Sequence, residues 1–151
     1  WDEAIKRVQK KIDRLELTNL KTINQKASSI SFKDNTIDLV CSNLGVNNFE
    51  NKETVFEKVY CMLKENGHFC LTTNDQSTFS ELFIGFEKAF LNLNIDLSLF
   101  RKYLESRTSA QTLIGEIEKF GFKHTKQLND KAYLRFASSE ALFNHSIINQ
   151  Q

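Results

Sequence analysis

The chain has 151 residues, of which 40% are hydrophobic and 26% are charged, and 20 basic and 19 acidic side chains give it a formal net charge of +1. This balance predicts a globular domain rather than a disordered chain, and it argues against a nucleic-acid-binding surface, which needs a basic stripe to displace counterions. No apolar run approaches the roughly 18 residues of a membrane-spanning helix, and the sequence shows no signal-peptide pattern.

The first predicted element is an amphipathic helix over residues 2–16. Its apolar residues recur at helical spacing: Ile5, Val8, Ile12 and Leu15. The alternating run Leu20–Ile23 predicts a short strand, and residues 24–36 are polar and turn-like. Residues 37–43 then have the continuous apolar character of a buried strand.

A helix and a second strand follow. Asn51 is expected to cap a helix that runs to about Lys64, and Gly67 is expected to end it in a left-handed conformation. The inner face of this helix is predicted to be Val55, Val59, Met62 and Leu63. Residues 68–73 predict another buried strand. A strand, a helix and a strand in this order favour two parallel strands joined by a crossover helix.

Residues 77–105 have helical sequence with one large apolar stripe: Phe79, Leu82, Phe83, Phe86 and Phe90. Thr108 and Gln111 then predict a capping box for a further helix, which Gly121 would end. The inner face of that helix is predicted to be Leu113, Ile114, Ile117 and Phe120.

The last part of the chain predicts an antiparallel hairpin and a final helix. Residues 122–128 and 132–136 flank the turn signal Asn129-Asp130-Lys131. Residues 139–148 predict the final helix. The fold class expected from the whole order is α/β, with parallel strands, covering helices and a C-terminal antiparallel hairpin.

Three segments together resemble class I S-adenosylmethionine-dependent methyltransferases. Residues 30–45 are similar to the fourth-strand region of that family, residues 59–69 to the helix end that leads into the fifth strand, and residues 118–122 to the entry into the sixth strand. The resemblance is greatest to small-molecule members of the ubiquinone/menaquinone-biosynthesis and biotin-pathway type. It implies a partial Rossmann-like methyltransferase fold in a single domain over residues 1–151.

The resemblance also implies which strands are present. Leu20–Ile23 would be the third strand, residues 37–43 the fourth and residues 68–73 the fifth. The first two strands, with their glycine-rich loop, would precede Trp1, so we expect the domain to be N-terminally incomplete and these residues alone to be inactive. The exposed edge of the sheet is then expected to be covered by the missing N-terminal segment or by a second copy of the chain.

The implied cofactor is S-adenosylmethionine, which in this family lies over the carboxyl ends of the strands. The expected cofactor-binding residues are Lys26, Ala27, Asn43, Leu44 and Gly45. Lys26 stands where the family has an acidic residue near the adenine, and lysine offers only donors where the adenine amino group needs an acceptor. Both a lost site and an alignment shifted by one or two residues explain this departure. A plain strand exit, in which Gly45 relieves strain, is the alternative for residues 43–45.

The expected substrate-binding residues are Asn47, Asn48, Phe49, Phe83 and Phe86. An asparagine amide does not titrate near neutral pH, so no catalytic residue is assigned and methyl transfer would depend on proximity and alignment. Phe83 and Phe86 belong to residues 77–107, which the resemblance implies are a lid over an apolar substrate. For residues 47–49 the alternative is a polar loop, and for the two phenylalanines it is ordinary core packing.

The remaining chemistry-bearing residues predict structural roles. The three cysteines, which have no metal-like spacing, are Cys41, Cys61 and Cys70. We expect buried free thiols in a reducing compartment, and therefore a cytoplasmic protein. Each histidine lies on a separate predicted element (His68, His124 and His145), so no metal site is predicted.

Two functions remain open from the sequence. The leading hypothesis is methyl transfer to a small-molecule acceptor by the complete protein, with no nucleic-acid partner. The alternative is a degenerate methyltransferase-like module that serves as a binding or scaffold partner.

Overall fold

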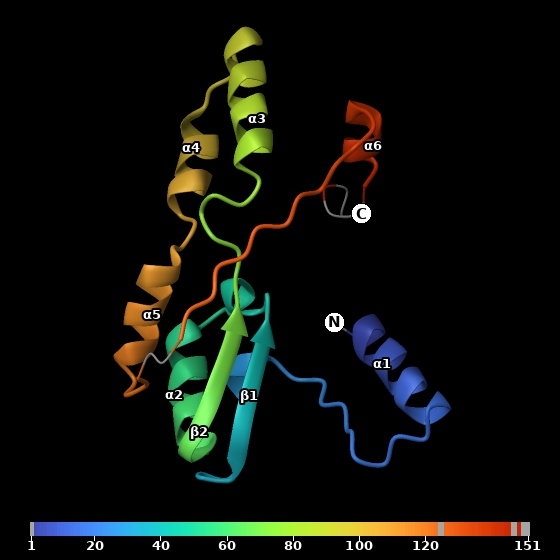
Figure 1. The fold of residues 1–151 in the computed structure, drawn as a ribbon, viewed down its shortest axis with the longest axis vertical. Coiled ribbons are helices and arrows are strands. Elements are labelled where there is room, and N and C mark those ends of the chain that lie inside the picture. Colours follow the sequence, from blue (N-terminus) through green and yellow to red (C-terminus); the bar gives the residue numbers. More distant parts are fainter. Residues whose placement is uncertain (1, 124–125, 146–147, 149–151) are drawn as a thin grey trace.

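The structure, a computed structural model, describes residues 2–123, 126–145 and 148. Its helices and strands are, in chain order, α1 (Asp2–Arg14), β1 (Ile37–Asn43), α2 (Lys52–Met62), β2 (Leu63–Thr72), α3 (Ser80–Asn92), α4 (Ser98–Glu105), α5 (Ala110–Glu118) and α6 (Ser139–Phe143). Figure 1 shows β1, β2, α2 and α5 gathered together, with α3 and α4 extending beyond the strand ends and α1 standing apart. No helix within the described ranges is long and apolar enough to cross a membrane.

The predicted strand–helix–strand unit is confirmed. β1 and β2 are parallel neighbours, and α2 connects them. The paired residues run in the same direction along both strands, from Leu39 opposite His68 to Asn43 opposite Thr72. The carboxyl ends of both strands therefore meet at one end of the sheet.

The pairing is irregular where β2 begins. Between Ile37 and Leu39 on β1, the partner on β2 advances from Leu63 to His68. Asn66 in this interval has a φ of 64°. Because α2 already ends at Met62 and Gly67 lies within β2, the prediction that Gly67 ends the helix in a left-handed conformation is wrong. Gly67 is needed for another reason: an added Cβ would lie 2.9 Å from the carbonyl oxygen of Lys64.

The core lies between the strands and α2. The Oδ1 atom of Asn51 accepts from the backbone N–H of Thr54, which confirms the predicted cap. α2 then buries Val55, Phe56, Val59 and Met62, a set that contains three of the four predicted inner-face residues; the fourth, Leu63, is also buried and begins β2.

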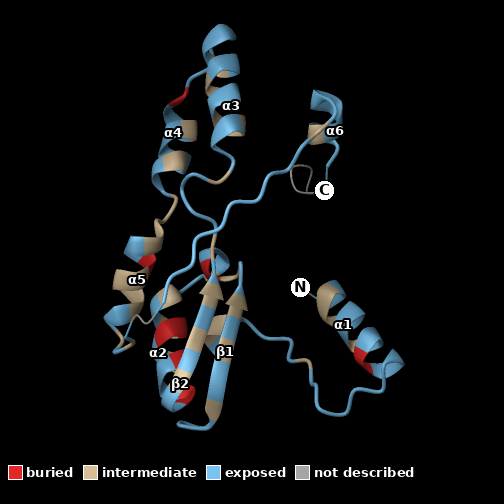
Figure 2. Ribbon diagram, in the orientation of Figure 1, coloured by how far each residue is buried: buried red, intermediate tan, exposed pale blue. Residues whose placement is uncertain are grey.

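Aromatic packing joins α5 to this core. The ring of Phe56, which is only 1% exposed, lies 6.2 Å from that of Phe69 and 6.1 Å from that of Phe120. Leu113 of α5 is buried in the same cluster. Figure 2 accordingly shows buried residues concentrated on α2 beside one face of the strands. α2 and α5 therefore cover one face of the two-stranded sheet.

The ends of the other helices differ slightly from expectation. α1 ends at Arg14 rather than at residue 16. The cap of α5 is Ser109, whose Oγ accepts from the N–H of Thr112, so the capping box predicted at Thr108 is wrong. Gly121 ends this region with a φ of 96°, as predicted. The helical prediction for residues 77–105 is confirmed as α3 and α4.

Two predicted strand regions are wrong within the described residues. Residues 20–23 have no strand, and residues 122–123 and 126–136 form no antiparallel hairpin; residues 124–125 lie outside the described part. A strand is stabilised by its hydrogen-bonded neighbour, and the described part supplies no neighbour to either segment. The final helix is also shorter than predicted, ending at Phe143.

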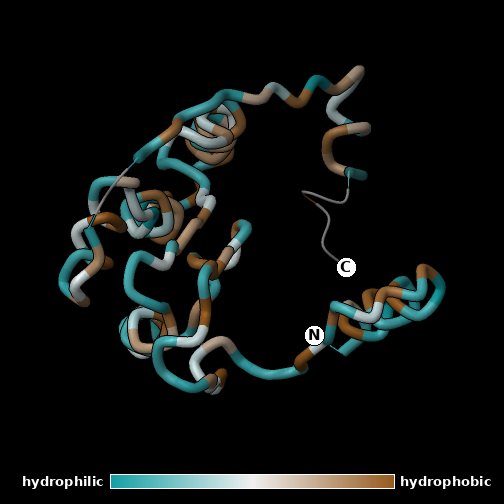
Figure 3. Tube along the Cα trace, turned by 60° about the horizontal axis from the view of Figure 1, so that its bottom comes forward, coloured by the Kyte–Doolittle hydropathy of each residue, from teal (hydrophilic) through white to brown (hydrophobic). Residues whose placement is uncertain are grey.

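The trace in Figure 3 runs as an open arc in which apolar and polar stretches alternate, and α1 stands at one end of it. Only Ile12 of the helix is buried, although its apolar stripe also includes Val8. The amphipathic pattern of α1 therefore correctly predicts a helix, although Val8 on its apolar face remains 50% exposed.

Candidate functional site

A small cavity lies beside the segment that follows β1. Its volume is about 130 Å³, and its lining residues are Lys26, Ala27, Ser28, Asn48, Phe49 and Glu50. Two segments, residues 26–28 and residues 48–50, come together to form it. This cavity, called here the first cavity, unites two of the predicted cofactor residues with two of the predicted substrate residues.

An ion pair spans the first cavity. The Nζ atom of Lys26 lies 2.9 Å from both carboxylate oxygens of Glu50. Both side chains are largely exposed, at 68% and 69%, and exposed pairs of this kind contribute only about 0–1 kcal/mol to stability. The pairing matters more for the chemistry of the cavity, because it places a carboxylate where Lys26 alone offers only donors.

Glu50 is a residue of the cavity that no sequence pattern predicts. The residue lies 24 positions from Lys26 along the chain, and no local pattern connects the two. It follows the exit of β1, however, so its proximity to the cavity depends on the same crossover unit that the sequence correctly predicts.

The carboxyl ends of the strands carry the other predicted cofactor residues. The hydroxyl of Thr72 donates to Oδ1 of Asn43 over 2.6 Å, and the N–H of Leu44 donates to the hydroxyl oxygen of Thr72 over 3.0 Å. Leu44 has a left-handed φ of 54°. An added Cβ on Gly45 would lie 3.0 Å from Oγ of Ser42. This strand exit is thus fixed by side-chain hydrogen bonds as well as by backbone pairing.

Asn47 belongs to the strand exit rather than to the first cavity. Its Nδ2 atom donates to Oγ1 of Thr73 over 3.0 Å, and the residue is absent from the cavity lining. Phe49 lines the cavity and also packs against both buried clusters around α2. The predicted site is therefore divided between a cavity and a neighbouring strand end.

Phe83 and Phe86 lie away from both places, on α3. Phe83 lines a second cavity of about 210 Å³, whose other lining residues are Gln76, Ser80, Ile84, Glu87, Leu104 and Arg107. Phe86 instead packs against other rings, 6.2 Å from Phe90 and 6.4 Å from Phe100. The structure does not bring these two phenylalanines to the first cavity.

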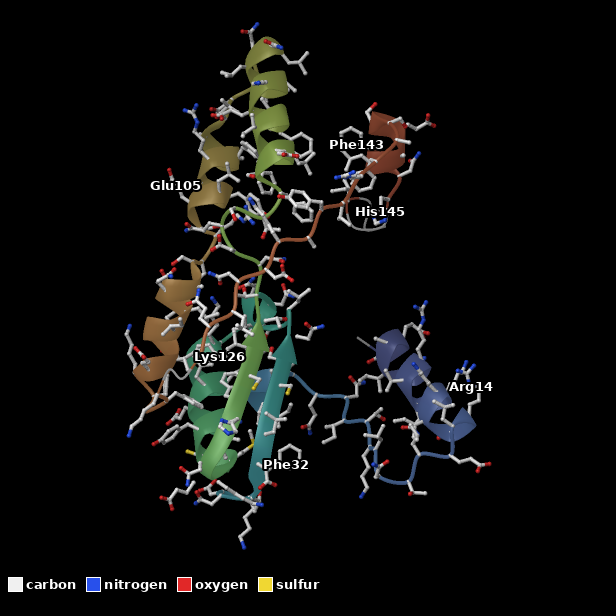
Figure 4. All side chains as sticks on the ribbon, viewed as in Figure 1. Arg14, Phe32, Glu105, Lys126, Phe143 and His145 are labelled. Atoms are coloured by element: carbon white, nitrogen blue, oxygen red, sulfur yellow. The ribbon has the colours of Figure 1, made fainter. Side chains whose placement is uncertain are left out.

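Phe86 also reaches the C-terminal helix. Its ring is stacked with that of Phe143 at 6.3 Å, and Figure 4 labels Phe143 on α6 beside α3. The aromatic stripe thus packs α3 against α4 and α6, although none of the residues of α3 is buried.

Arg107 connects the region of α3 and α4 to the segment that follows β2. Its guanidinium donates to the carbonyl oxygens of Gln76 and Asp75, over 2.8 and 3.0 Å, and lies 5.0 Å from the ring centre of Phe83. Hydrogen bonds from the N–H and hydroxyl of Ser77 lower the pKa of the Asp75 carboxyl below its ordinary value. The loop that lines the second cavity at Gln76 is therefore fixed by hydrogen bonds from Arg107 and by those between Asp75 and Ser77.

The cysteines are exposed in the structure (Cys41, Cys61 and Cys70), so the prediction of buried thiols is wrong. Cys41 and Cys70 lie on the sheet face opposite to the one that α2 and α5 cover. His68 also lies on β2, while His124 falls outside the described residues. Among the residues that the structure describes, no group of three or more His, Cys, Asp or Glu side chains is arranged to hold a metal ion.

Comparison with known proteins finds similarity in the first part of the chain. Residues 1–71 match a protein family described as a methyltransferase domain. A demethylmenaquinone methyltransferase of Geobacillus sp. (strain WCH70) is 30% identical over 82 residues, which is 54% of this chain and 33% of that relative. The chain therefore spans about a third of the length of this relative. The family match contains β1, α2, most of β2 and all residues of the first cavity.

Proposed function

We propose that this chain is part of an S-adenosylmethionine-dependent methyltransferase that acts on a small molecule. The observation that supports the proposal is that the family match and the candidate site lie in the same part of the chain. The residues that match the methyltransferase family include β1, α2, β2 up to Leu71, and the first cavity. In α/β sheets of this kind, ligands bind beyond the carboxyl ends of the strands, at the place where residues 43–50 lie.

The residues of the first cavity suit the adenosine end of the cofactor. The carboxylate of Glu50 supplies the acceptor that an adenine amino group needs, and each oxygen keeps capacity beyond its bond to Lys26. Phe49 supplies an apolar wall. Glu50 therefore takes the place of the acidic side chain that position 26 lacks.

The strand exit suits the remainder of the cofactor. Since Oδ1 of Asn43 accepts from Thr72, the amide nitrogen of Asn43 is the group that remains to donate to a ligand. Gly45 permits close approach to the backbone. When bound, S-adenosylmethionine supplies a methyl group on a sulfonium centre. The chain contributes alignment of the acceptor, because the amides of Asn47 and Asn48 do not act as bases near neutral pH.

The second cavity is proposed to hold part of the methyl acceptor, with Phe83 as its apolar wall. This role accords with the lid implied for residues 77–107. It places the acceptor side on α3 and α4, and the cofactor side on the region that matches the family.

We further propose that these 151 residues bind the cofactor weakly and transfer no methyl group by themselves. The chain has five glycines, and none of them forms a glycine-rich loop of the kind that grips a nucleotide cofactor. For the cavity and strand exit alone, a dissociation constant on the order of 1 mM is expected.

Nuclear magnetic resonance tests the proposal at this affinity. Titration of the isotopically labelled chain with S-adenosylhomocysteine should shift the backbone amides of residues 26–28 and 43–50. Glu50→Ala should weaken the binding about tenfold, since it removes a charged hydrogen-bond acceptor. Glu57→Ala is the matched control, because Glu57 is an exposed glutamate of α2 that does not line the cavity.

The result also decides between the enzyme and the scaffold. If millimolar S-adenosylhomocysteine shifts no amide in residues 26–28 or 43–50, the cofactor proposal is wrong and the degenerate binding module is favoured. If Glu50→Ala and Glu57→Ala weaken the binding of S-adenosylhomocysteine equally, the cofactor proposal stands but the role proposed for Glu50 is wrong.

A further inference from the structure

Two cysteines occupy directly paired positions on the sheet. Cys41 of β1 is the register partner of Cys70 of β2. Both side chains are exposed. Because side chains that are paired across neighbouring strands point to the same face, the two thiols stand side by side.

The face that carries these thiols is the uncovered one. The adjacent residues Val40 and Phe69 point to the other face, where they pack against the cluster on α2. Leu39, two residues before Cys41, is half-exposed. Nothing in the described part of the chain covers the thiol pair, so small reagents in solution reach it.

The backbone geometry suits a bond between the two sulfurs. Neighbouring strands lie about 4.7–4.9 Å apart, and disulfides join residues whose Cα atoms are about 4.4–6.8 Å apart. The pair lies near the carboxyl ends of strands that belong to a two-stranded sheet, where no further strand in the described part resists a small adjustment.

We propose that Cys41 and Cys70 form a thiol–disulfide exchange site that closes to an intramolecular disulfide when it meets a small oxidised disulfide such as oxidised glutathione. One thiolate attacks the small disulfide and releases one glutathione thiolate. The other cysteine thiolate then attacks the resulting mixed disulfide and releases the second. The two cysteine thiols lose two protons and two electrons, and the electrons reduce the small disulfide to two thiols.

The bond would act next to the candidate cofactor site. It joins the strands two residues before Asn43 and Thr72, whose side chains are hydrogen-bonded to each other. Oxidation would therefore fix the spacing of the two strand ends. The existence of the thiol pair does not depend on methyl transfer.

Cys61 provides an internal control, because it is also exposed but lies at the end of α2. Trypsin separates the three cysteines onto different peptides, since cleavage after lysine gives residues 34–52, 59–64 and 65–88. The test is incubation of the folded chain with oxidised glutathione, capping of free thiols with N-ethylmaleimide, and mass spectrometry of the unreduced digest.

The expected product is a link between peptides 34–52 and 65–88, while Cys61 joins no other cysteine and is found as a capped thiol or as a glutathione adduct. Cys61→Ser should give the same link, and Cys41→Ser should leave Cys70 as a glutathione adduct. In denaturant the preference should move to Cys61 and Cys70, which are closer in sequence. A link to Cys61 in the folded chain, adducts on both Cys41 and Cys70, or no reaction would each overturn the proposal.

Discussion

The unit from β1 to β2 and the segment from residue 126 to residue 136 differ most sharply in what surrounds them. In the first, Phe56 is 1% exposed and packs between two other rings; in the second, Leu128 is 81% and Tyr133 71% exposed. Both segments contain strand-like apolar residues. The difference shows that a β-type pattern becomes a strand only where a neighbouring strand and a covering helix are available.

Removal of the Phe56 side chain should cause the largest change in the free energy of unfolding. Phe56→Ala empties the centre of the core and should lower the free energy of unfolding by about 3–5 kcal/mol. Leu128→Ala, at an exposed position, should change it by less than about 0.5 kcal/mol. Urea denaturation followed by circular dichroism measures both. Similar losses for the two variants would mean that residues 126–136 are packed as firmly as α2.

The sequence predicts the crossover unit well because its determinants are local. The cap at Asn51, the apolar face of α2 and two continuous apolar strands all lie within residues 37–73. The hairpin prediction fails because alternation and a turn signal do not reveal whether a partner surface exists. The same reason accounts for the missing strand at residues 20–23.

The candidate site is predictable only in part. Residues 26, 27, 48 and 49 follow from the resemblance and do meet at one cavity. Glu50 and Thr72 do not follow from it, because their roles arise from contacts between distant segments. The exposure of the cysteines could not be predicted either, since it depends on which face of the sheet a helix covers.

Two glycine substitutions should change the stability by intermediate amounts and in opposite directions. Gly121 has a φ of 96°, and an added Cβ would lie 2.8 Å from the ring of Tyr60, so Gly121→Ala should cost about 1–3 kcal/mol. Gly85 of α3 has open space around it, and Gly85→Ala should instead stabilise the chain by up to about 1 kcal/mol. Thermal unfolding of both variants checks the opposite signs. A stabilising Gly121→Ala would contradict the packing of α5 against α2.

The cap of α2 should contribute less. Asn51→Ala removes the acceptor for the N–H of Thr54 and should cost about 1 kcal/mol, whereas Asn51→Ser keeps an acceptor and should cost little. Urea denaturation of the two variants provides the measurement. Equal destabilisation by alanine and serine would argue against a capping role.

The smallest effect on stability is expected at the first cavity. Lys26→Ala breaks an exposed ion pair and should change the free energy of unfolding by about 0–1 kcal/mol, with the difference from the unaltered chain shrinking at high salt. Denaturation curves at low and high ionic strength test this. A large, salt-independent loss would mean that Lys26 has a structural role beyond the pair with Glu50.

The parallel pairing of β1 with β2 is the claim on which the fold, the candidate site and the thiol pair all depend. Nuclear Overhauser spectroscopy of the labelled chain measures it most directly. Parallel pairing predicts cross-strand contacts between Leu39 and His68, Cys41 and Cys70, and Asn43 and Thr72, all advancing in the same direction. Contacts that advance in opposite directions along the two strands, or no contacts between them, would contradict it.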